Sequence, residues 1–145
     1  MSFPKPVPGL VIRYAYLWRV EQQRGQEEGL KDRPCAVILV TTDDEGDQVV
    51  TVLPITHTQP LNPMLAVEIP HTTKRRLGLD DERSWIVLTE ANRFVWPGPD
   101  VRMSQPGNPE SVAYGLLPRA LFQEVKDKLT AAISARLMRI VPRTE

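Results

Sequence analysis

Short runs of hydrophobic and β-branched residues recur along the first two thirds of the chain and predict strands there. Each run is bounded by glycine, proline or charged residues, a pattern typical of the strands of a small sheet. The four or five strands predicted in this way cover residues 9–18, 34–40, 48–56, 64–69 and 84–89. We expect loops in the polar segments 20–34, 71–83 and 94–110, with one helical turn in the second.

The hydrophobic period changes in the last quarter of the chain. From Leu117 to Ile133, apolar residues recur at spacings of three and four, with charged residues between them. This pattern predicts an amphipathic helix, and Pro118 suits its first position. Strands followed by one terminal helix indicate an α+β fold, in which the helix caps a small, strongly bent antiparallel sheet or barrel.

Length and composition indicate a single globular domain. The 145 residues suit one domain over 1–145, and 18 basic residues balance 18 acidic ones, so the broad positive field of a duplex-DNA binder is absent. A single cysteine, Cys35, excludes an intrachain disulfide, and its apolar neighbours predict a buried side chain. No apolar run approaches the ~20 residues of a membrane span, and no apolar signal segment is found, so we expect a cytoplasmic protein without a membrane partner.

Metal and cofactor motifs are absent from the sequence. The candidate ligands His57, His71 and Cys35 occur without CxxC, HxxxH or HExxH spacing. The sequence also lacks a glycine-rich phosphate loop and a Gly-x-Ser-x-Gly motif. We therefore expect a site that uses neither a metal nor a cofactor.

Polar residues flank the second and third predicted strands. If these strands pair as a hairpin through the acidic turn between them, Arg33 lies beside Thr56 at the open end. Lys31 precedes Arg33, and His57 and Thr58 follow Thr56. A guanidinium beside hydroxyls and an imidazole is a donor set suited to a phosphate. The alternative is a solvated strand flank and an ordinary turn without a functional role.

Five short segments resemble, in order, segments of the MazF/PemK toxin family. The first is Glu21-Gln22, which stands ahead of a glycine-bearing loop as the family's EQ does. Arg33 to Val40 (RPCAVILV) is similar to the family's RPxLVI, and Pro54-Ile55-Thr56 is similar to its P-[ILV]-T. Met64 to Ile69 (MLAVEI) is similar to its HVEI, and Ser84 to Glu90 (SWIVLTE) with Arg93 is similar to its SVILLEQIR. The predicted terminal helix also occurs at this place in the family. Together the matches cover most of the chain.

The resemblance implies the fold, activity and partners of that family. The expected protein is the toxin of a type II toxin–antitoxin system, a small SH3-like barrel that forms a homodimer and binds a cognate antitoxin protein. Its expected activity is metal-independent endoribonuclease cleavage of single-stranded RNA, which leaves a 2′,3′-cyclic phosphate. The family's catalytic positions match Arg33 and Thr56. The expected substrate-binding residues are Lys31, His57, Thr58, Glu90 and Arg93.

Three features differ from the family pattern and leave other functions open. The segment 21–33 is longer than usual, the residues after Glu90 differ, and Leu88 stands where some members carry an arginine. One alternative is a catalytically inactive module of the same fold that binds an antitoxin-like peptide or nucleic acid, and another is a small barrel that reads nucleic acid for regulation. The basic run at 74–76 could contact an RNA backbone. It could equally pair with the acidic residues at 80–82 on a solvated surface.

Overall fold

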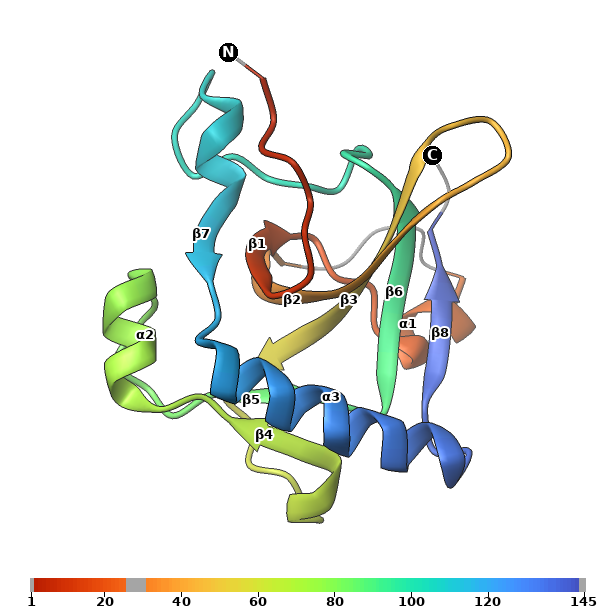
Figure 1. The fold of residues 1–145 in the computed structure, drawn as a ribbon, viewed down its shortest axis with the longest axis vertical. Helices are drawn as coiled ribbons and strands as arrows, with labels where there is room; N and C mark the ends of the chain where they lie inside the picture. Colours follow the sequence, from red (N-terminus) through yellow and green to blue (C-terminus); the bar gives the residue numbers. More distant parts are fainter. Residues whose placement is uncertain (1, 26–30, 144–145) are drawn as a thin grey trace.

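One sheet and three helices make up the fold, which a computed structural model describes for residues 2–25 and 31–143. The helices are α1 (Arg19–Gln23), α2 (His71–Leu77) and α3 (Arg119–Ser134), and short 3-10 turns span Pro63–Leu65 and Pro109–Val112. The strands are β1 (Leu10–Tyr14), β2 (Arg33–Thr42), β3 (Gln48–Thr56), β4 (Ala66–Glu68), β5 (Trp85–Val87), β6 (Glu90–Val95), β7 (Ala113–Leu116) and β8 (Arg139–Pro142). All eight strands belong to the one sheet (Figure 1).

The sheet consists almost entirely of antiparallel pairs. Its main path runs β4–β5–β3–β2–β1–β7, and β6 pairs with β3 and with β8. Within the described residues, the β6–β8 pair is the parallel one. The predicted α+β class is confirmed. Closure into an SH3-like barrel stays a prediction, because the strand pairs found in residues 2–25 and 31–143 do not join β4 to β7.

The strands β2 and β3 form the predicted hairpin. Asp43 fixes the turn, because its Oδ1 accepts hydrogen bonds from the backbone N–H of Glu45 (3.0 Å) and of Asp47 (2.9 Å). From this turn the antiparallel pairing extends to Cys35 and Pro54. An aspartate that binds the backbone two and four residues ahead stabilises a turn locally. The turn therefore sets which residues meet at the open end of the hairpin.

The strand β3 sends its side chains alternately into two apolar clusters, one on each face of the sheet. Leu53 and Ile55 belong to the cluster that includes Val125 of α3. Val50 and Val52 belong to the second cluster, with residues of β1 and β6. Because both faces of β3 are buried, its sequence is a nearly continuous apolar run. Figure 1 shows α3 lying across the end of the sheet beside β4, which it contacts.

The predicted amphipathic helix is confirmed as α3. Its buried residues are Leu121, Val125, Leu129 and Ala132, which follow the expected spacing. Ile133 is 52% exposed, because it lies at the edge of the apolar stripe, where the sheet no longer covers it. Among the described residues, no helix is both long enough and apolar enough to cross a membrane.

Several elements differ from the sequence-based prediction. The helix α1 begins at Arg19 and extends into the predicted loop 20–34, of which residues 26–30 fall outside the described part of the chain. The helix α2 has seven residues where one turn was expected. The strand β6 was missed because Asn92 interrupts its apolar run, although that side chain is buried and binds the backbone N–H (2.9 Å) and carbonyl (2.8 Å) of Leu17. The strands β7 and β8 were also missed, and β8 follows the helix that the pattern placed last.

Candidate functional site

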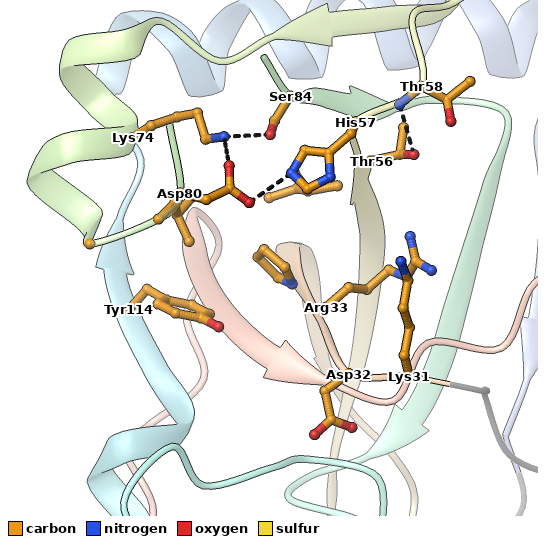
Figure 2. Close-up of a pocket in the computed structure, with 14 residues that line it drawn as sticks. Lys31, Asp32, Arg33, Thr56, His57, Thr58, Lys74, Asp80, Ser84 and Tyr114 are labelled. Atoms are coloured by element: carbon orange, nitrogen blue, oxygen red, sulfur yellow. Dashed lines mark hydrogen bonds and ion pairs between the residues drawn. The ribbon is translucent and has the colours of Figure 1, made fainter. Parts of the chain in front are cut away.

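The open end of the β2–β3 hairpin lines a cavity of about 340 Å³. Its walls come from the start of β2, the end of β3, the segment after α2, and β7 (Figure 2). The residues that the sequence singled out around the two strands all line it, namely Lys31, Arg33, Thr56, His57 and Thr58. The other polar and charged residues in its wall are Asp32, Lys74, Asp80, Ser84 and Tyr114.

The hairpin register brings Arg33 opposite Thr56. Cys35 is the antiparallel partner of Pro54, and continuing this register by two residues pairs Arg33 with Thr56. On its other edge β2 is held by β1, where Tyr14 is the partner of Arg33. The predicted hairpin and the meeting of these two residues in one cavity are therefore confirmed. Their catalytic roles stay predictions.

Arg33 carries a hydrogen-bond donor that no described residue accepts. Its Nε is buried and has no partner among the described residues. Its guanidinium carbon lies 4.9 Å from the centre of the Trp18 ring, a cation–π contact that orients the side chain without using its N–H groups. Buried polar groups are nearly always hydrogen-bonded in proteins. An oriented arginine that borders a cavity is suited to bind an anion, because the planar fork of N–H groups of a guanidinium matches the oxygens of a phosphate or carboxylate.

Asp32 does not neutralise Arg33, although the two residues are adjacent. Its carboxylate pairs with Arg13 at 3.6 Å and with Arg102 at 3.5 Å. Figure 2 shows Asp32 turned to one side and the side chains of Lys31 and Arg33 extending to the other. Alternation along an extended chain explains this division, because residues two apart point the same way. Lys31 and Arg33 therefore bring two positive groups to the same cavity.

The end of β3 supplies a hydroxyl whose orientation is set by the backbone. Thr56 Oγ1 accepts a hydrogen bond from the backbone N–H of Thr58 at 3.2 Å. A hydroxyl that accepts through its oxygen keeps its own hydrogen for another acceptor. Thr56 can thus donate a hydrogen bond to a ligand that Arg33 also binds.

A chain of three ionisable side chains, Lys74, Asp80 and His57, forms another wall of the cavity. Lys74 is only 2% exposed. Its ammonium donates to Asp80 Oδ1 (2.5 Å), to Ser84 Oγ (2.6 Å) and to the carbonyl of Glu82. The other carboxylate oxygen of Asp80 lies 2.7 Å from His57 Nε2. Burial disfavours the charged form of Asp80, but the hydrogen bonds from Lys74 and His57 outweigh it and lower the pKa of this carboxyl.

The burial of Lys74 decides between the two interpretations of the basic run at 74–76 for that one residue. Because Lys74 turns inward and pairs with Asp80, it is not available to an RNA backbone. Arg75 and Arg76 are exposed, and Arg76 donates a hydrogen bond to the carbonyl of Leu116 at 2.8 Å. Lys74 therefore pairs with an acidic residue, as one interpretation predicted. The pair is buried on the lysine side, whereas the sequence indicated a solvated surface.

His57, Asp80 and Glu82 are the one group in the described part of the chain that offers three ligand atoms to a metal ion, all within 4.8 Å of one another. All three residues are exposed. The ammonium of Lys74 lies 2.5 Å from Asp80, and a positive charge in contact with a ligand opposes the binding of a cation. A site that works without metal stays a prediction.

A second hollow of about 470 Å³ adjoins the first cavity. The two share Thr56 and Thr58 in their walls. The second hollow is mainly apolar, and its apolar wall is formed by Trp18, Pro60, Leu61, Leu65, Ala66 and Val87. Because Arg33 packs on the ring of Trp18, a positive group and a flat aromatic surface meet where the two hollows join.

Two of the predicted substrate-binding residues lie elsewhere. Glu90 does not line the cavity and instead accepts hydrogen bonds from the Tyr16 hydroxyl (3.1 Å) and the Arg19 backbone N–H (3.0 Å). Burial raises the pKa of the Glu90 carboxyl, and these two hydrogen bonds only partly oppose that effect. Arg93 is exposed on β6 opposite Thr51 and is also outside the cavity wall.

Four residues of the cavity wall were missed as site residues: Lys74, Asp80, Ser84 and Tyr114. Lys74 and Asp80 lie in a polar segment where nothing in the pattern separates a buried ion pair from solvated charges, and Ser84 is the first residue of the predicted strand 84–89. The i, i+6 spacing of Lys74 and Asp80 is the single local sign of their contact, and it is weak. Tyr114 belongs to β7, a strand that no pattern in the sequence predicted.

No family model and no curated protein matches this chain. The resemblance to the MazF/PemK family therefore stays a prediction.

Proposed function

We propose that this protein is a metal-independent endoribonuclease that cleaves single-stranded RNA, the toxin of a type II toxin–antitoxin system. The observation that carries the proposal is the Arg33 guanidinium, whose buried Nε has no partner among the described residues and which shares a cavity with the Thr56 hydroxyl. The oxygens of a phosphate match a guanidinium fork beside a hydroxyl donor.

The chemistry needs only groups that these residues supply. Attack of a ribose 2′-oxygen on the adjacent phosphorus builds negative charge on the phosphate oxygens, and fixed donors stabilise that charge. Arg33 can bind two of these oxygens, and Thr56 can donate to a third or to the 2′-oxygen. Lys31 lines the same cavity and adds a second positive charge. The product ends are a 2′,3′-cyclic phosphate and a 5′-hydroxyl.

The neighbouring apolar hollow supports a single-stranded substrate. A base can enter a protein pocket only when it is free of its stack and pair, as in single-stranded RNA. Trp18 offers a flat ring in that hollow, next to the guanidinium of Arg33. Stacking of a base on an aromatic side chain contributes about 1–3 kcal/mol. A phosphate at Arg33 and its base beside Trp18 would thus occupy both hollows.

The proposal includes the assembly and the fold expected for this family. A homodimer with a completed SH3-like barrel would present the site, and a cognate antitoxin would cover it. Carboxylates and phosphates use the same guanidinium and ammonium donors. An acidic antitoxin segment would therefore compete with RNA for Lys31 and Arg33.

Cleavage of a single-stranded RNA of mixed sequence in EDTA tests the proposal. We expect wild-type protein to cleave, and Arg33→Ala and Arg33→Lys to lose about 10²–10³-fold in rate, because a lysine cannot form the two-pronged contact. Thr56→Val keeps the shape of the side chain and removes the hydroxyl, and it should also slow cleavage. Arg119→Ala and Thr41→Val change the same residue types at exposed positions away from the cavity and should retain the wild-type rate.

Thermal unfolding of each variant separates loss of chemistry from loss of structure. A folded Arg33→Ala protein that cleaves RNA at the wild-type rate would contradict the proposed function. So would cleavage that stops in EDTA and returns with a divalent ion.

A non-catalytic module that binds an antitoxin-like peptide is the second candidate. The observation in its favour is the apolar hollow, beside which Leu61 is fully exposed and Met64 is largely exposed. Exposed apolar residues around a hollow are typical of sites that receive a partner chain. Absence of RNA cleavage, together with binding of an acidic amphipathic peptide that Leu61→Ser weakens, would favour this function over the first.

A further inference from the structure

We propose that His57 is the general base of this reaction and that Asp80 and Lys74 hold its imidazole in position. The inference rests on the proposed ribonuclease function and adds the proton acceptor that this function lacks. Arginine stays protonated and a threonine hydroxyl is a poor base, so neither Arg33 nor Thr56 can take the 2′-hydroxyl proton. His57 lines the same cavity, and Figure 2 shows its imidazole between Asp80 and Thr56.

The contact with Asp80 decides which imidazole nitrogen can accept a proton. Nε2 lies 2.7 Å from Asp80 Oδ2, and an ionised carboxylate can only accept a hydrogen bond, so the shared hydrogen belongs to Nε2. The neutral ring then carries its lone pair on Nδ1. The carboxylate of Glu82 is 3.6 Å from Nδ1, beyond hydrogen-bonding distance. Nδ1 is therefore open to a substrate hydroxyl.

Lys74 fixes the carboxylate that orients the imidazole. The Asp80 side chain is 50% exposed and would turn freely if His57 were its sole partner. Its other oxygen accepts hydrogen bonds from the ammonium of Lys74 and from the backbone N–H of Glu82 (3.1 Å), and Lys74 is itself bound to Ser84 and to the Glu82 carbonyl in the interior. The ammonium also offsets the negative charge that Asp80 presents to the ring. A buried cation thus connects the core of the protein to the exposed histidine through one carboxylate.

The reaction step balances without a metal. The 2′-hydroxyl proton passes to His57 Nδ1 while the 2′-oxygen forms a bond to phosphorus. The bond from phosphorus to the 5′-oxygen breaks, and this oxygen takes a proton from water. The imidazolium then gives its proton to the hydroxide that remains, so that no proton is consumed overall. In this scheme His57 is a catalytic residue, and Asp80 and Lys74 are positioning residues.

Cleavage kinetics with added imidazole test the role of His57. We expect His57→Ala to lower kcat by about 10²-fold or more while KM changes by less than about threefold, because a general base acts in the transition state. Free imidazole should restore part of the rate of His57→Ala and leave Arg33→Ala inactive. His71→Ala is the matched control, since the chain's other histidine is exposed at the start of α2 and does not line the cavity.

The position of the imidazole hydrogen can be measured without any RNA. A long-range ¹H–¹⁵N NMR spectrum should show the Nε2–H form for His57 in the wild type and a mixture of forms in Asp80→Asn. The same variant should lower kcat by about tenfold or more, because an amide no longer selects one form of the ring. Asp81→Asn replaces the exposed neighbouring carboxylate outside the cavity wall and should change neither measurement.

The outcomes separate this inference from the proposed function. If Arg33→Ala abolishes cleavage but His57→Ala keeps the wild-type kcat, or loses activity that imidazole cannot restore, the role of His57 as base is wrong and the ribonuclease remains. The Nδ1–H form in the wild-type spectrum also overturns the role of His57. If the wild-type protein cleaves no RNA, the proposed function and this inference are both wrong.

Discussion

Arg33 and Lys74 show how burial divides the charged residues of this protein into two kinds. Lys74 is buried with three oxygen acceptors around its ammonium. Arg33 is half-buried with a donor nitrogen that no described residue accepts. A buried cation with a full set of partners holds its surroundings in place, whereas a guanidinium that borders a cavity can turn its outer N–H groups toward a ligand. For this reason we assign ligand binding to Arg33 and a positioning role to Lys74.

Glu90 gives a prediction about stability at the scale of one residue. Because burial raises the pKa of this carboxyl in the folded state, the folded protein binds the proton more tightly than the unfolded chain does. Stability is therefore lost as the pH rises from about 4, the ordinary range of a carboxyl, through the raised pKa. Glu90→Gln keeps an acceptor for Tyr16 and Arg19 but cannot ionise, so we expect its melting temperature near pH 7 to exceed that of the wild type by about 2–4 °C.

Melting curves between about pH 4 and pH 8 check this expectation. The advantage of Glu90→Gln should disappear near the acidic end of the range. Glu45→Gln, in the exposed β2–β3 turn, should show no such dependence. An advantage that grew on acidification would contradict the assigned direction of the pKa shift.

The packing of the helix α2 against the strand β7 shapes one wall of the cavity. Lys74 comes from α2 and Tyr114 from β7, and both line the cavity wall. The two elements approach closely at Gly115, where an added Cβ would lie 2.9 Å from Leu77 Cδ2. The backbone at Gly115 has φ of +140°, which side-chain-bearing residues rarely adopt. Its backbone conformation therefore favours glycine there, and a Cβ at this position would also force the Leu77 side chain to shift.

Substitution of Gly115 should loosen this wall. We expect Gly115→Ala to lower the free energy of unfolding by about 1–3 kcal/mol, because it adds a steric contact to an unfavourable backbone conformation. Chemical denaturation measures the change. Gly107→Ala is the matched control, since Gly107 has φ of +78° with nothing within 4 Å of an added Cβ, and it should cost less. Equal losses for the two variants would mean that the contact with Leu77 does not limit the packing.

The charges of the whole molecule cancel, and this limits how it can bind nucleic acid. Eighteen basic and eighteen acidic residues give no net charge. In the proposed ribonuclease, attraction for RNA would therefore come from a local group of cations, and the cavity brings together Lys31 and Arg33. Asp32, between them in sequence, is already paired with Arg13 and Arg102. Few phosphates should be neutralised in the complex.

The salt dependence of RNA binding measures how many phosphates the protein neutralises. A single strand gives a slope of about −0.7 in log K against log salt for each phosphate neutralised, so two cations predict roughly −1.4. Fluorescence anisotropy with an RNA that carries 2′-O-methyl groups, and so cannot be cleaved, gives the slope. Lys31→Gln should reduce it by about 0.7, whereas Lys5→Gln, far along the chain from the cavity residues, should leave it unchanged. A slope steeper than about −3 would indicate a broad basic surface instead.

Elements whose signals are local could be predicted from the sequence. Continuous apolar runs predicted β2 and β3. The strand β3 is buried on both faces and so needs few polar residues, whereas burial in β2 is confined to Cys35, Ala36 and Val37, and Leu39 is 51% exposed. The acidic turn joined these strands into a hairpin, and the hairpin alone was sufficient to bring Arg33 beside Thr56. The spacing of Leu121, Val125 and Leu129 likewise predicted α3. Each of these predictions depends on residues close in sequence.

The burial of polar residues, and the pairing of strands that are far apart in sequence, became visible with the fold. The strand β8 pairs with β6, and its neighbour Arg143 is buried against Asp100 at 2.8 Å, contacts that no local pattern marks. Lys74 looked like one of several surface cations until the fold placed it in the interior beside Asp80. The Arg33–Thr56 pair could be predicted from the sequence, because the pairing of two neighbouring strands is enough to bring these residues together. The Lys74–Asp80–His57 chain required the fold, because the desolvation of a side chain depends on what packs over it.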